Sequence, residues 1–208
     1  MRLFGIATAL LLALVGPTVA VSSSATAGPR GGAHPPTMLG PGDAGVSGIG
    51  HEAIIRKSRF GYVYISGKHN SHLRVTYLED RNALRYRDTR TDRVKLPERG
   101  CEREQVKKGI SAVCTIPRSF DDKRVFVQVW PRLGNDYVDG RTLPKRFRLW
   151  VLTDAGNDVV YGGAGNDFVN GAKGDDRIWG GKGHDWLRGG PGRDRIFAGD
   201  GRDRVSHG

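Results

Sequence analysis

The sequence lacks long hydrophobic runs and is poor in cysteine. No apolar run among the 208 residues reaches the ~18 residues that cross a bilayer as a helix, so we predict no membrane span. Only two cysteines are present, which excludes a disulfide-dense miniprotein and a zinc site built from cysteines.

The sequence also lacks the motifs of common enzyme classes. It contains neither a Gly-x-Ser-x-Gly nucleophile motif nor a phosphate-binding loop. His51-Glu52 begins like a metalloprotease motif, but Ile55 stands where the second histidine is needed. His69 and His72 lie in an expected turn without a third ligand. We therefore predict no catalytic residues and no enzymatic activity.

The first residues have the features of an export signal. A short apolar run follows the basic Met1-Arg2, and Ala25-Thr26-Ala27 fits the small-x-small cleavage pattern, with Thr18-Val19-Ala20 as a second candidate. We predict a signal peptide over 1–27 and a secreted, extracellular protein. Residues 28–50 are rich in Gly, Pro and Ala and are predicted to form a flexible linker.

Glycine, in contrast, is abundant, with 31 residues, and many of them belong to a repeat. From Thr153 the chain divides into six consecutive units of nine residues without a gap. In every unit position four is Gly, position six is Asp and position eight is aliphatic. The position-six residues are Asp158, Asp167, Asp176, Asp185, Asp194 and Asp203. Composition alone does not produce six units in unbroken register.

Each unit predicts a glycine-rich turn followed by a short strand. One aliphatic side chain per unit cannot form a core alone, so the units must stack, with two consecutive units making one full coil. The aliphatic residues expected to share one sheet are Val160, Ile178 and Ile196, and those of the other are Val169, Leu187 and Val205. We predict an all-β fold, with a parallel β-roll over 153–206 preceded by a small β-rich domain.

Stacking also lines up the position-six aspartates along the two edges of the coil. Carboxylates about 5 Å apart, the spacing of strands, repel each other unless a cation lies between them. Carboxylates and turn carbonyls form an oxygen-only cage, which suits Ca²⁺ better than Mg²⁺, and the absence of thiolates argues against Zn²⁺. We predict that the six aspartates bind calcium.

The repeat resembles the RTX-type calcium-binding nonapeptide, G-G-x-G-x-D-x-U-x, over residues 153–206. In that family each ion lies between turns two units apart, so the resemblance implies at most four sites. The implied pairs are Asp158 with Asp176, Asp167 with Asp185, Asp176 with Asp194, and Asp185 with Asp203. A β-rich front with a cysteine pair running into such repeats is also similar to secreted calcium-binding repeat proteins of Gram-positive bacteria.

Position five departs from the family pattern toward the end of the repeats. The first three units have Asn or Asp there, whereas the last three have His184, Arg193 and Arg202. Two interpretations stay open. The arginines are salt-bridged surface residues, or the last calcium sites are weak or empty.

Residues 51–152 are predicted to form a basic, β-rich domain. Strands are expected over the alternating stretches 62–65, 73–77, 125–130 and 147–151. The turn signal Gly67-Lys68-His69-Asn70 predicts a hairpin of the first two. Leu133–Asp139 looks like an isolated repeat unit ahead of a short insertion, which places the start of the coil near Val125.

Export to an oxidising compartment predicts a disulfide between Cys101 and Cys114. The bond closes a loop of about 14 residues, which corresponds to about 3 kcal/mol in the chain-entropy model.

The net charge of +11 comes almost entirely from residues 51–152, which hold 23 Lys and Arg against 12 Asp and Glu. An anionic cell-wall polymer or polysaccharide is a conceivable partner, and a merely solvated surface is the other interpretation. Extracellular DNA is a further polyanion, but no nucleic-acid motif appears in the sequence, so no specific nucleic-acid partner is predicted. The favoured function is a secreted calcium-binding protein whose repeats fold on binding Ca²⁺. The alternative is a polyanion-binding surface protein with the repeats as a stalk.

Overall fold

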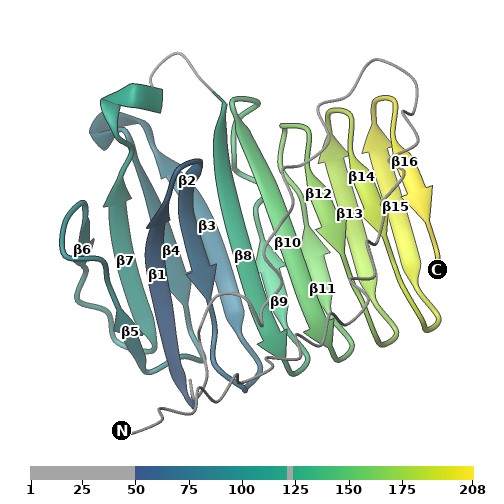
Figure 1. The fold of residues 1–208 in the computed structure, drawn as a ribbon, viewed down its shortest axis with the longest axis horizontal. Coiled ribbons are helices and arrows are strands. Elements are labelled where there is room, and N and C mark those ends of the chain that lie inside the picture. The colour runs from purple at the N-terminus through teal and green to yellow at the C-terminus, as the bar shows by residue number, and fades with distance from the viewer. Residues whose placement is uncertain (1–49, 121–123) are drawn as a thin grey trace, which may run out of the picture. The chain divides into compact units, whose positions relative to one another are not determined.

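The computed structural model describes residues 50–120 and 124–208 (Figure 1). The predicted signal peptide and all but the last residue of the predicted linker lie outside the described residues. The described chain is built from strands, with two short 3₁₀ helices, η1 (Glu79–Arg81) and η2 (Arg118–Phe120).

The strands form two sheets of eight strands each within the described residues. Sheet A contains, in spatial order, β16 (Arg204–Ser206), β14 (Trp186–Arg188), β12 (Phe168–Asn170), β10 (Phe147–Ala155), β8 (Val125–Leu133), β2 (Gly61–Ile65), β1 (Glu52–Ser58) and β5 (Arg93–Lys95). Sheet B contains β15 (Arg195–Asp200), β13 (Arg177–Lys182), β11 (Val159–Tyr161), β9 (Tyr137–Asp139), β3 (His72–Leu78), β4 (Ala83–Asp88), β7 (Ile110–Thr115) and β6 (Cys101–Arg103).

From β8 onward the chain winds alternately through sheet A and sheet B as a β-solenoid of about 4 turns over residues 125–206. Neighbouring strands within each sheet are parallel, as the predicted β-roll requires. The aliphatic residues pair as Val160 with Ile178 and Ile178 with Ile196 in sheet B, and Val169 with Leu187 and Leu187 with Val205 in sheet A. The predicted fold class, its two-unit coil and the start of the coil near Val125 are therefore confirmed.

The repeats share one hydrophobic core with the residues before them. Val160, Val169, Ile178 and Leu187 are completely buried and belong to the same cluster as Tyr64 and other side chains of the preceding region. Strand β10 runs across the expected boundary between residues 152 and 153. The division into a domain over 51–152 and repeats over 153–206 stays a prediction.

The hairpin predicted for residues 62–77 is wrong, because its two strands lie in different sheets. Strand β2 pairs with β8 in sheet A, and β3 pairs with β9 in sheet B, both in parallel. Tyr64 and Leu73 each bury their side chains completely in the shared core. The turn at Gly67–Asn70 therefore carries the chain around the edge of the solenoid, and residues 61–78 form a further coil that stacks on β8 and β9.

The remaining strands extend both sheets beyond that coil. In sheet B, β4, β7 and β6 follow β3 in antiparallel order, and in sheet A, β1 is antiparallel to β2. Cys101 on β6 lies opposite Cys114 on β7, with 4.0 Å between their Cα atoms, and the two form a disulfide. The predicted disulfide is confirmed.

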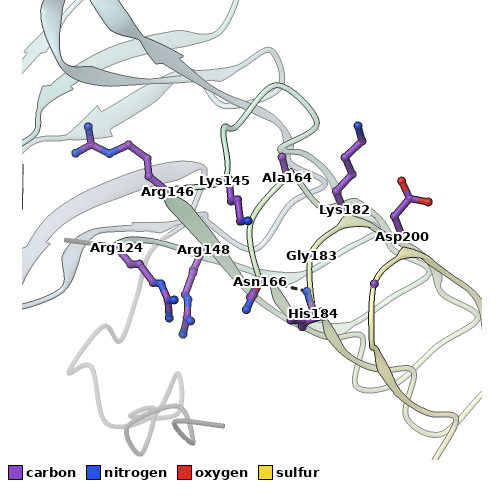
Figure 2. Close-up of a pocket in the computed structure, with 11 residues that line it drawn as sticks. Arg124, Lys145, Arg146, Arg148, Ala164, Asn166, Lys182, Gly183, His184 and Asp200 are labelled. Carbon is purple, nitrogen blue, oxygen red and sulfur yellow. Dashed lines mark hydrogen bonds between the residues drawn. The ribbon is translucent and has the colours of Figure 1, made fainter. Parts of the chain in front are cut away.

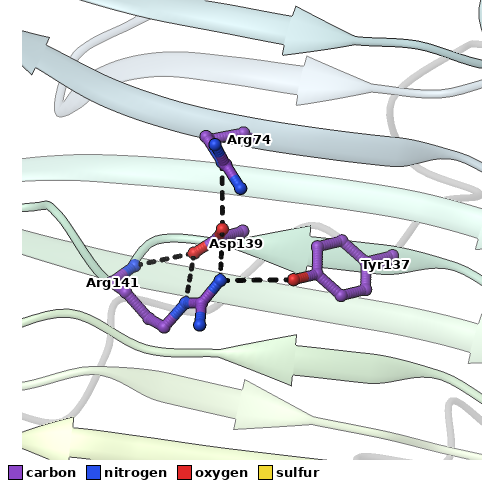
Figure 3. A network of polar contacts seen from close by, with 4 residues as sticks. All are labelled: Arg74, Tyr137, Asp139 and Arg141. Carbon is purple, nitrogen blue, oxygen red and sulfur yellow. Dashed lines mark hydrogen bonds and ion pairs between the residues drawn. The ribbon is translucent and has the colours of Figure 1, made fainter.

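A buried carboxylate ties the coil of residues 61–78 to the next coil (Figure 3). Asp139 on β9 accepts a hydrogen bond from Nε of Arg74 on β3 at 3.0 Å and another from Nη2 of Arg141 at 2.9 Å. Burial alone would raise the pKa of Asp139, but the hydrogen bonds from Arg141 and the positive charges of Arg141 and Arg74 together outweigh burial and lower the pKa. Asp139 is therefore an ionised structural group with its own cationic partners.

Asp88, at the end of β4, plays a similar structural role beside the coil of residues 61–78. Its buried carboxylate accepts hydrogen bonds from the hydroxyl groups of Tyr64 at 2.7 Å, Ser71 at 2.6 Å and Thr91 at 2.8 Å. Two backbone N–H groups also donate to this carboxylate. Because these bonds use both carboxylate oxygens, Asp88 is not a candidate metal ligand.

Candidate metal centre

The six predicted ligands lie in two rows along the edges of the solenoid. We call the turns that lead from sheet A to sheet B edge 1, and those that lead from sheet B to sheet A edge 2. Asp158, Asp176 and Asp194 lie on edge 1, and Asp167, Asp185 and Asp203 lie on edge 2. The structure thus places the aspartates in the rows that the period of nine predicts.

Each row is held by hydrogen bonds from coil to coil. Oδ1 of each aspartate accepts the backbone N–H of the corresponding residue one coil earlier. The bonds are Asp158 N to Asp176 Oδ1 at 2.8 Å, Asp167 N to Asp185 Oδ1 at 2.8 Å, Asp176 N to Asp194 Oδ1 at 3.0 Å, and Asp185 N to Asp203 Oδ1 at 2.9 Å. One oxygen of each carboxylate is therefore used by the fold itself.

The second carboxylate oxygen is buried and lacks a hydrogen-bond partner within the described residues at Asp158, Asp176, Asp185 and Asp194. At Asp176, Asp185 and Asp194 this oxygen faces the first glycine of its own unit, whereas the unit of Asp158 begins with Thr153. A Cβ atom added to Gly171 would lie 2.1 Å from Oδ2 of Asp176, and one added to Gly189 would lie 2.0 Å from Oδ2 of Asp194. At these three glycines the carboxylate occupies the space that a side chain would need.

Burial raises the pKa of these carboxyl groups. The pKa rises to about 6 at Asp158, about 8 at Asp167, and about 7 at Asp176 and Asp185. Burial is the largest cause in each case, and neighbouring carboxylates add to the increase while hydrogen bonds from backbone N–H groups oppose it. The ionised rows are therefore costly unless a cation is bound.

These raised pKa values predict a specific pH dependence for the calcium-free protein. A carboxyl whose pKa is raised by folding stabilises the fold below its ordinary pKa of 3.8, and this contribution is lost as the pH rises through 6 to 8. Raising a pKa by one unit corresponds to about 1.4 kcal/mol. We expect thermal unfolding of the calcium-stripped protein to occur at a clearly lower temperature at pH 8.5 than at pH 5.5. An unfolding temperature that is constant or rises across this interval would contradict the prediction.

Sequence reasoning missed Asp136 as a member of the row on edge 1. The backbone N–H of Asp136 donates to Oδ1 of Asp158 at 2.7 Å, and Oδ1 of Asp136 accepts the N–H of Ser71 at 2.5 Å. Asp136 is buried, its Oδ2 lacks a hydrogen-bond partner within the described residues, and burial raises its pKa to about 8. The signal was present in the sequence as Gly134-Asn135-Asp136, inside the isolated repeat unit.

Position five forms a second row of hydrogen bonds with the opposite direction. Its side chain accepts the backbone N–H of the position-five residue one coil later. The bonds are Asn157 N to Asn135 Oδ1 at 2.8 Å, Asp175 N to Asn157 Oδ1 at 2.9 Å, Arg193 N to Asp175 Oδ1 at 2.9 Å, His184 N to Asn166 Oδ1 at 3.1 Å, and Arg202 N to His184 Nδ1 at 2.9 Å. Position five thus has a structural role on the exposed side of each turn.

The same geometry bears on the arginines at position five. Arg193 is exposed, and its Nε lies 3.9 Å from Oδ2 of Asp175. This contact favours the interpretation of Arg193 as a salt-bridged surface residue. The alternative of weak or empty last calcium sites is addressed by the titration described below.

The carboxylate oxygens suit a hard cation, but they need further ligands to complete a site. Among residues 50–120 and 124–208, no three His, Cys, Asp or Glu side chains come together as a metal-binding group. The histidines at 69 and 72 have structural contacts instead, since His69 bonds to Thr91 and His72 stacks on Tyr137. Two aspartates from successive coils would therefore need turn carbonyls as further ligands, which gives the oxygen-only set that Ca²⁺ prefers.

Comparisons with known proteins agree with this interpretation of the repeats. The family model of the RTX calcium-binding nonapeptide repeat (4 copies) matches residues 150–178 and 179–208. No curated protein and no solved structure matches the chain. The part of the chain that the structure describes contains no helix long and apolar enough to cross a membrane. The matched model describes a structural calcium-binding repeat and not an enzyme. Residues 150–208 are therefore RTX calcium-binding nonapeptide repeats, folded as a β-roll.

Proposed function

We propose that this chain is a secreted calcium-binding protein in which Asp158, Asp167, Asp176, Asp185, Asp194 and Asp203 hold Ca²⁺ between successive coils. The observation that carries the proposal is the set of buried Oδ2 atoms, in four of these aspartates, that lack a hydrogen-bond partner within the described residues; three of the four face a glycine. Asp136 extends the row on edge 1 and is a further candidate ligand. A bound calcium ion supplies the positive charge that the stacked carboxylates need.

The chain's own residues define what calcium would change. The fold already uses Oδ1 of each aspartate to join two coils, so Oδ2 is left for a cation, except that Oδ2 of Asp167 also accepts the backbone N–H of Gly163 at 2.6 Å. Neutralising the stacked carboxylates removes their mutual repulsion and stabilises the contact between coils. Calcium binding and folding of the repeats are then a single coupled process.

Secretion is part of the proposal. The predicted export signal at 1–27 supports it, and a disulfide between Cys101 and Cys114 fits an oxidising compartment. Extracellular calcium modules bind at about 10⁻⁴–10⁻³ M, a range suited to a protein that meets calcium outside the cell.

Calorimetric titration of the calcium-stripped protein tests the proposal. We expect saturable Ca²⁺ binding, with at most four ions held by pairs of position-six aspartates two units apart, a fifth if Asp136 and Asp158 also hold one, and Mg²⁺ binding much more weakly. A count below four would identify weak or empty sites among the last coils. Absence of calcium binding, or equal binding of both ions, would overturn the proposal.

A polyanion-binding role for the basic region is a second candidate function. A hollow lined by cationic side chains favours it; most of these cations belong to the basic region 51–152, and one, Lys182, belongs to the repeats.

A further inference from the structure

A hollow of about 960 Å³ lies on edge 2, where successive turns from sheet B to sheet A line up (Figure 2). Its cationic side chains come from residues before the repeats and from the repeats themselves. Those lining residues are Arg124, Lys145, Arg146, Arg148 and Lys182. Asp200 is the only carboxylate among the described residues that line the hollow.

Two of the arginines lie next to each other in the hollow. Figure 2 shows the side chains of Arg124 and Arg148 extending side by side in the same direction. Burial lowers the pKa of Arg148, and the positive charge of Arg124 lowers it further, against a smaller opposing effect of Asp167. Nε of Arg148 is buried and lacks a hydrogen-bond partner within the described residues. Two like charges held side by side in this way indicate a site for a negatively charged group.

The neutral polar groups of the hollow are arranged as donors. Oδ1 of Asn166 accepts the N–H of His184, which leaves the amide NH₂ of Asn166 to donate. Nδ1 of His184 accepts the N–H of Arg202, so the neutral imidazole carries its proton on Nε2. The acceptor atoms of both side chains are thus used by the turns, and hydrogen-bond donors remain for a ligand.

We propose that the hollow on edge 2 binds a small oligosaccharide bearing sulfate or phosphate groups. The guanidinium groups of arginine pair well with such oxyanions. A tetrahedral anion presents oxygens toward donors that come from several turns, whereas a planar carboxylate does not. The volume suits a ligand of a few sugar units. No Phe, Tyr or Trp is among the described lining residues, and His184 is the one aromatic ring among them, so the hollow offers little surface for stacking successive nucleobases and does not favour single-stranded nucleic acid.

This site extends beyond the region that the charge distribution alone suggests. The sequence assigns the basic surface to residues 51–152, whereas Asn166, Lys182 and His184 belong to the repeats. The hollow exists only when the first coils of the β-roll are stacked on β8 and β10. The repeats are then one wall of the binding site and not only a stalk.

The test is a titration of the full chain, with calcium present throughout, using sucrose octasulfate and a glycerol-phosphate oligomer as probes and uncharged sucrose as a control. The double variant R124Q/K182Q removes two exposed cations from the hollow. The matched control K107Q/K108Q removes two exposed cations between β6 and β7, at the other end of sheet B. We expect R124Q/K182Q to weaken probe binding about tenfold and K107Q/K108Q to change it less than twofold.

The two probes distinguish the sources of the anion, because the sulfated sugar mimics a sulfated polysaccharide and the oligomer mimics a phosphodiester wall polymer. The affinity should fall steeply with salt concentration, with a smaller slope for R124Q/K182Q. The proposal would be overturned if both double variants weakened probe binding equally or if neither probe bound. It would also be overturned if an oligogalacturonate bound more tightly than both probes. Calcium titration of R124Q/K182Q should match the unmodified protein, so that failure of this site and failure of calcium binding are told apart.

Discussion

Removing calcium is expected to unfold the repeats of the intact chain while leaving much of the region before them folded. In the repeats, the aliphatic row provides four completely buried side chains, whereas Val205 in the last coil is 45% exposed. Burying one such side chain contributes roughly 1.5–3 kcal/mol, and ordering each residue costs about 1–2 kcal/mol in backbone entropy. The repeats therefore depend on further stabilisation.

Calcium supplies that stabilisation by mass action. One site contributes about 2.7 kcal/mol when the calcium concentration is one hundred times the dissociation constant. The region before the repeats has a larger share of buried side chains, including Tyr62, Tyr64 and Tyr86, and it contains the disulfide. Unfolding in chelator should therefore begin in the repeats.

Hydrogen exchange and limited proteolysis of the full chain measure this effect. In chelator we expect rapid exchange and cleavage within 153–206 and retained protection of β3, β4 and β7. Millimolar Ca²⁺ should restore protection of the repeats, and the same concentration of Mg²⁺ should restore much less. Equal protection of 153–206 in chelator and in calcium would show that the repeats are a scaffold that does not need the metal.

Asp176→Ala is expected to be, together with Asp185→Ala, the most damaging single substitution among the position-six aspartates. The resemblance to RTX repeats pairs Asp176 with both Asp158 and Asp194, so its loss would affect two sites. The substitution also removes the acceptor for the backbone N–H of Asp158. We expect saturating calcium to stabilise the variant by on the order of 3–5 kcal/mol less than the unmodified protein.

Two further variants separate the causes of this loss. Asp176→Asn keeps an oxygen that can accept the N–H of Asp158 but removes the charge, so the calcium contribution should be lost while unfolding in chelator changes little. Asp203→Ala serves as the matched control, because Asp203 is paired with Asp185 alone and is less buried. Thermal unfolding with and without calcium measures both the stabilisation by calcium and the stability in chelator. If Asp203→Ala proves as damaging as Asp176→Ala, the sharing of Asp176 between two sites is incorrect.

The period of nine made the repeats predictable from the sequence, including which aliphatic residues share a sheet. A fixed repeat specifies its own register, so Val160, Ile178 and Ile196 had to align once two units were assigned to one coil. The first unit before the insertion was visible for the same reason. The carboxylate of Asp136 was missed as a ligand because it precedes the unbroken run.

The coil over residues 61–78 was not predictable in this way. It occupies the same register as the solenoid, with Leu73 opposite Val138, but a long excursion separates the two in sequence. Asn70 and Ser71 occupy the places that Asn135 and Asp136 occupy in the next coil, and Ser71 does not match the aspartate of the repeat. The turn was recognisable, whereas its direction depended on contacts with strands that lie far away in the sequence.

The basic hollow was hidden for a related reason. Arg124, Arg148 and Lys182 are distant in sequence and meet only because the turns on edge 2 stack. Charge counting detects the excess of cations in 51–152, but it carries no information on which coil brings them together.

The spacing of the coils determines how such a chain can change in length during evolution. Val160 pairs with Ile178, the equivalent residue two repeat units later, so inserting or deleting a pair of units adds or removes one coil and preserves both hydrogen-bonded rows. Inserting a single unit would move every later strand to the opposite sheet and exchange edge 1 with edge 2. Val138 pairs with Val160 across a longer stretch of chain, and the extra residues lie in the loop on edge 2 that contributes Lys145 to the hollow. Whole coils therefore lengthen the scaffold, whereas small loop insertions at the turns let it acquire new binding chemistry.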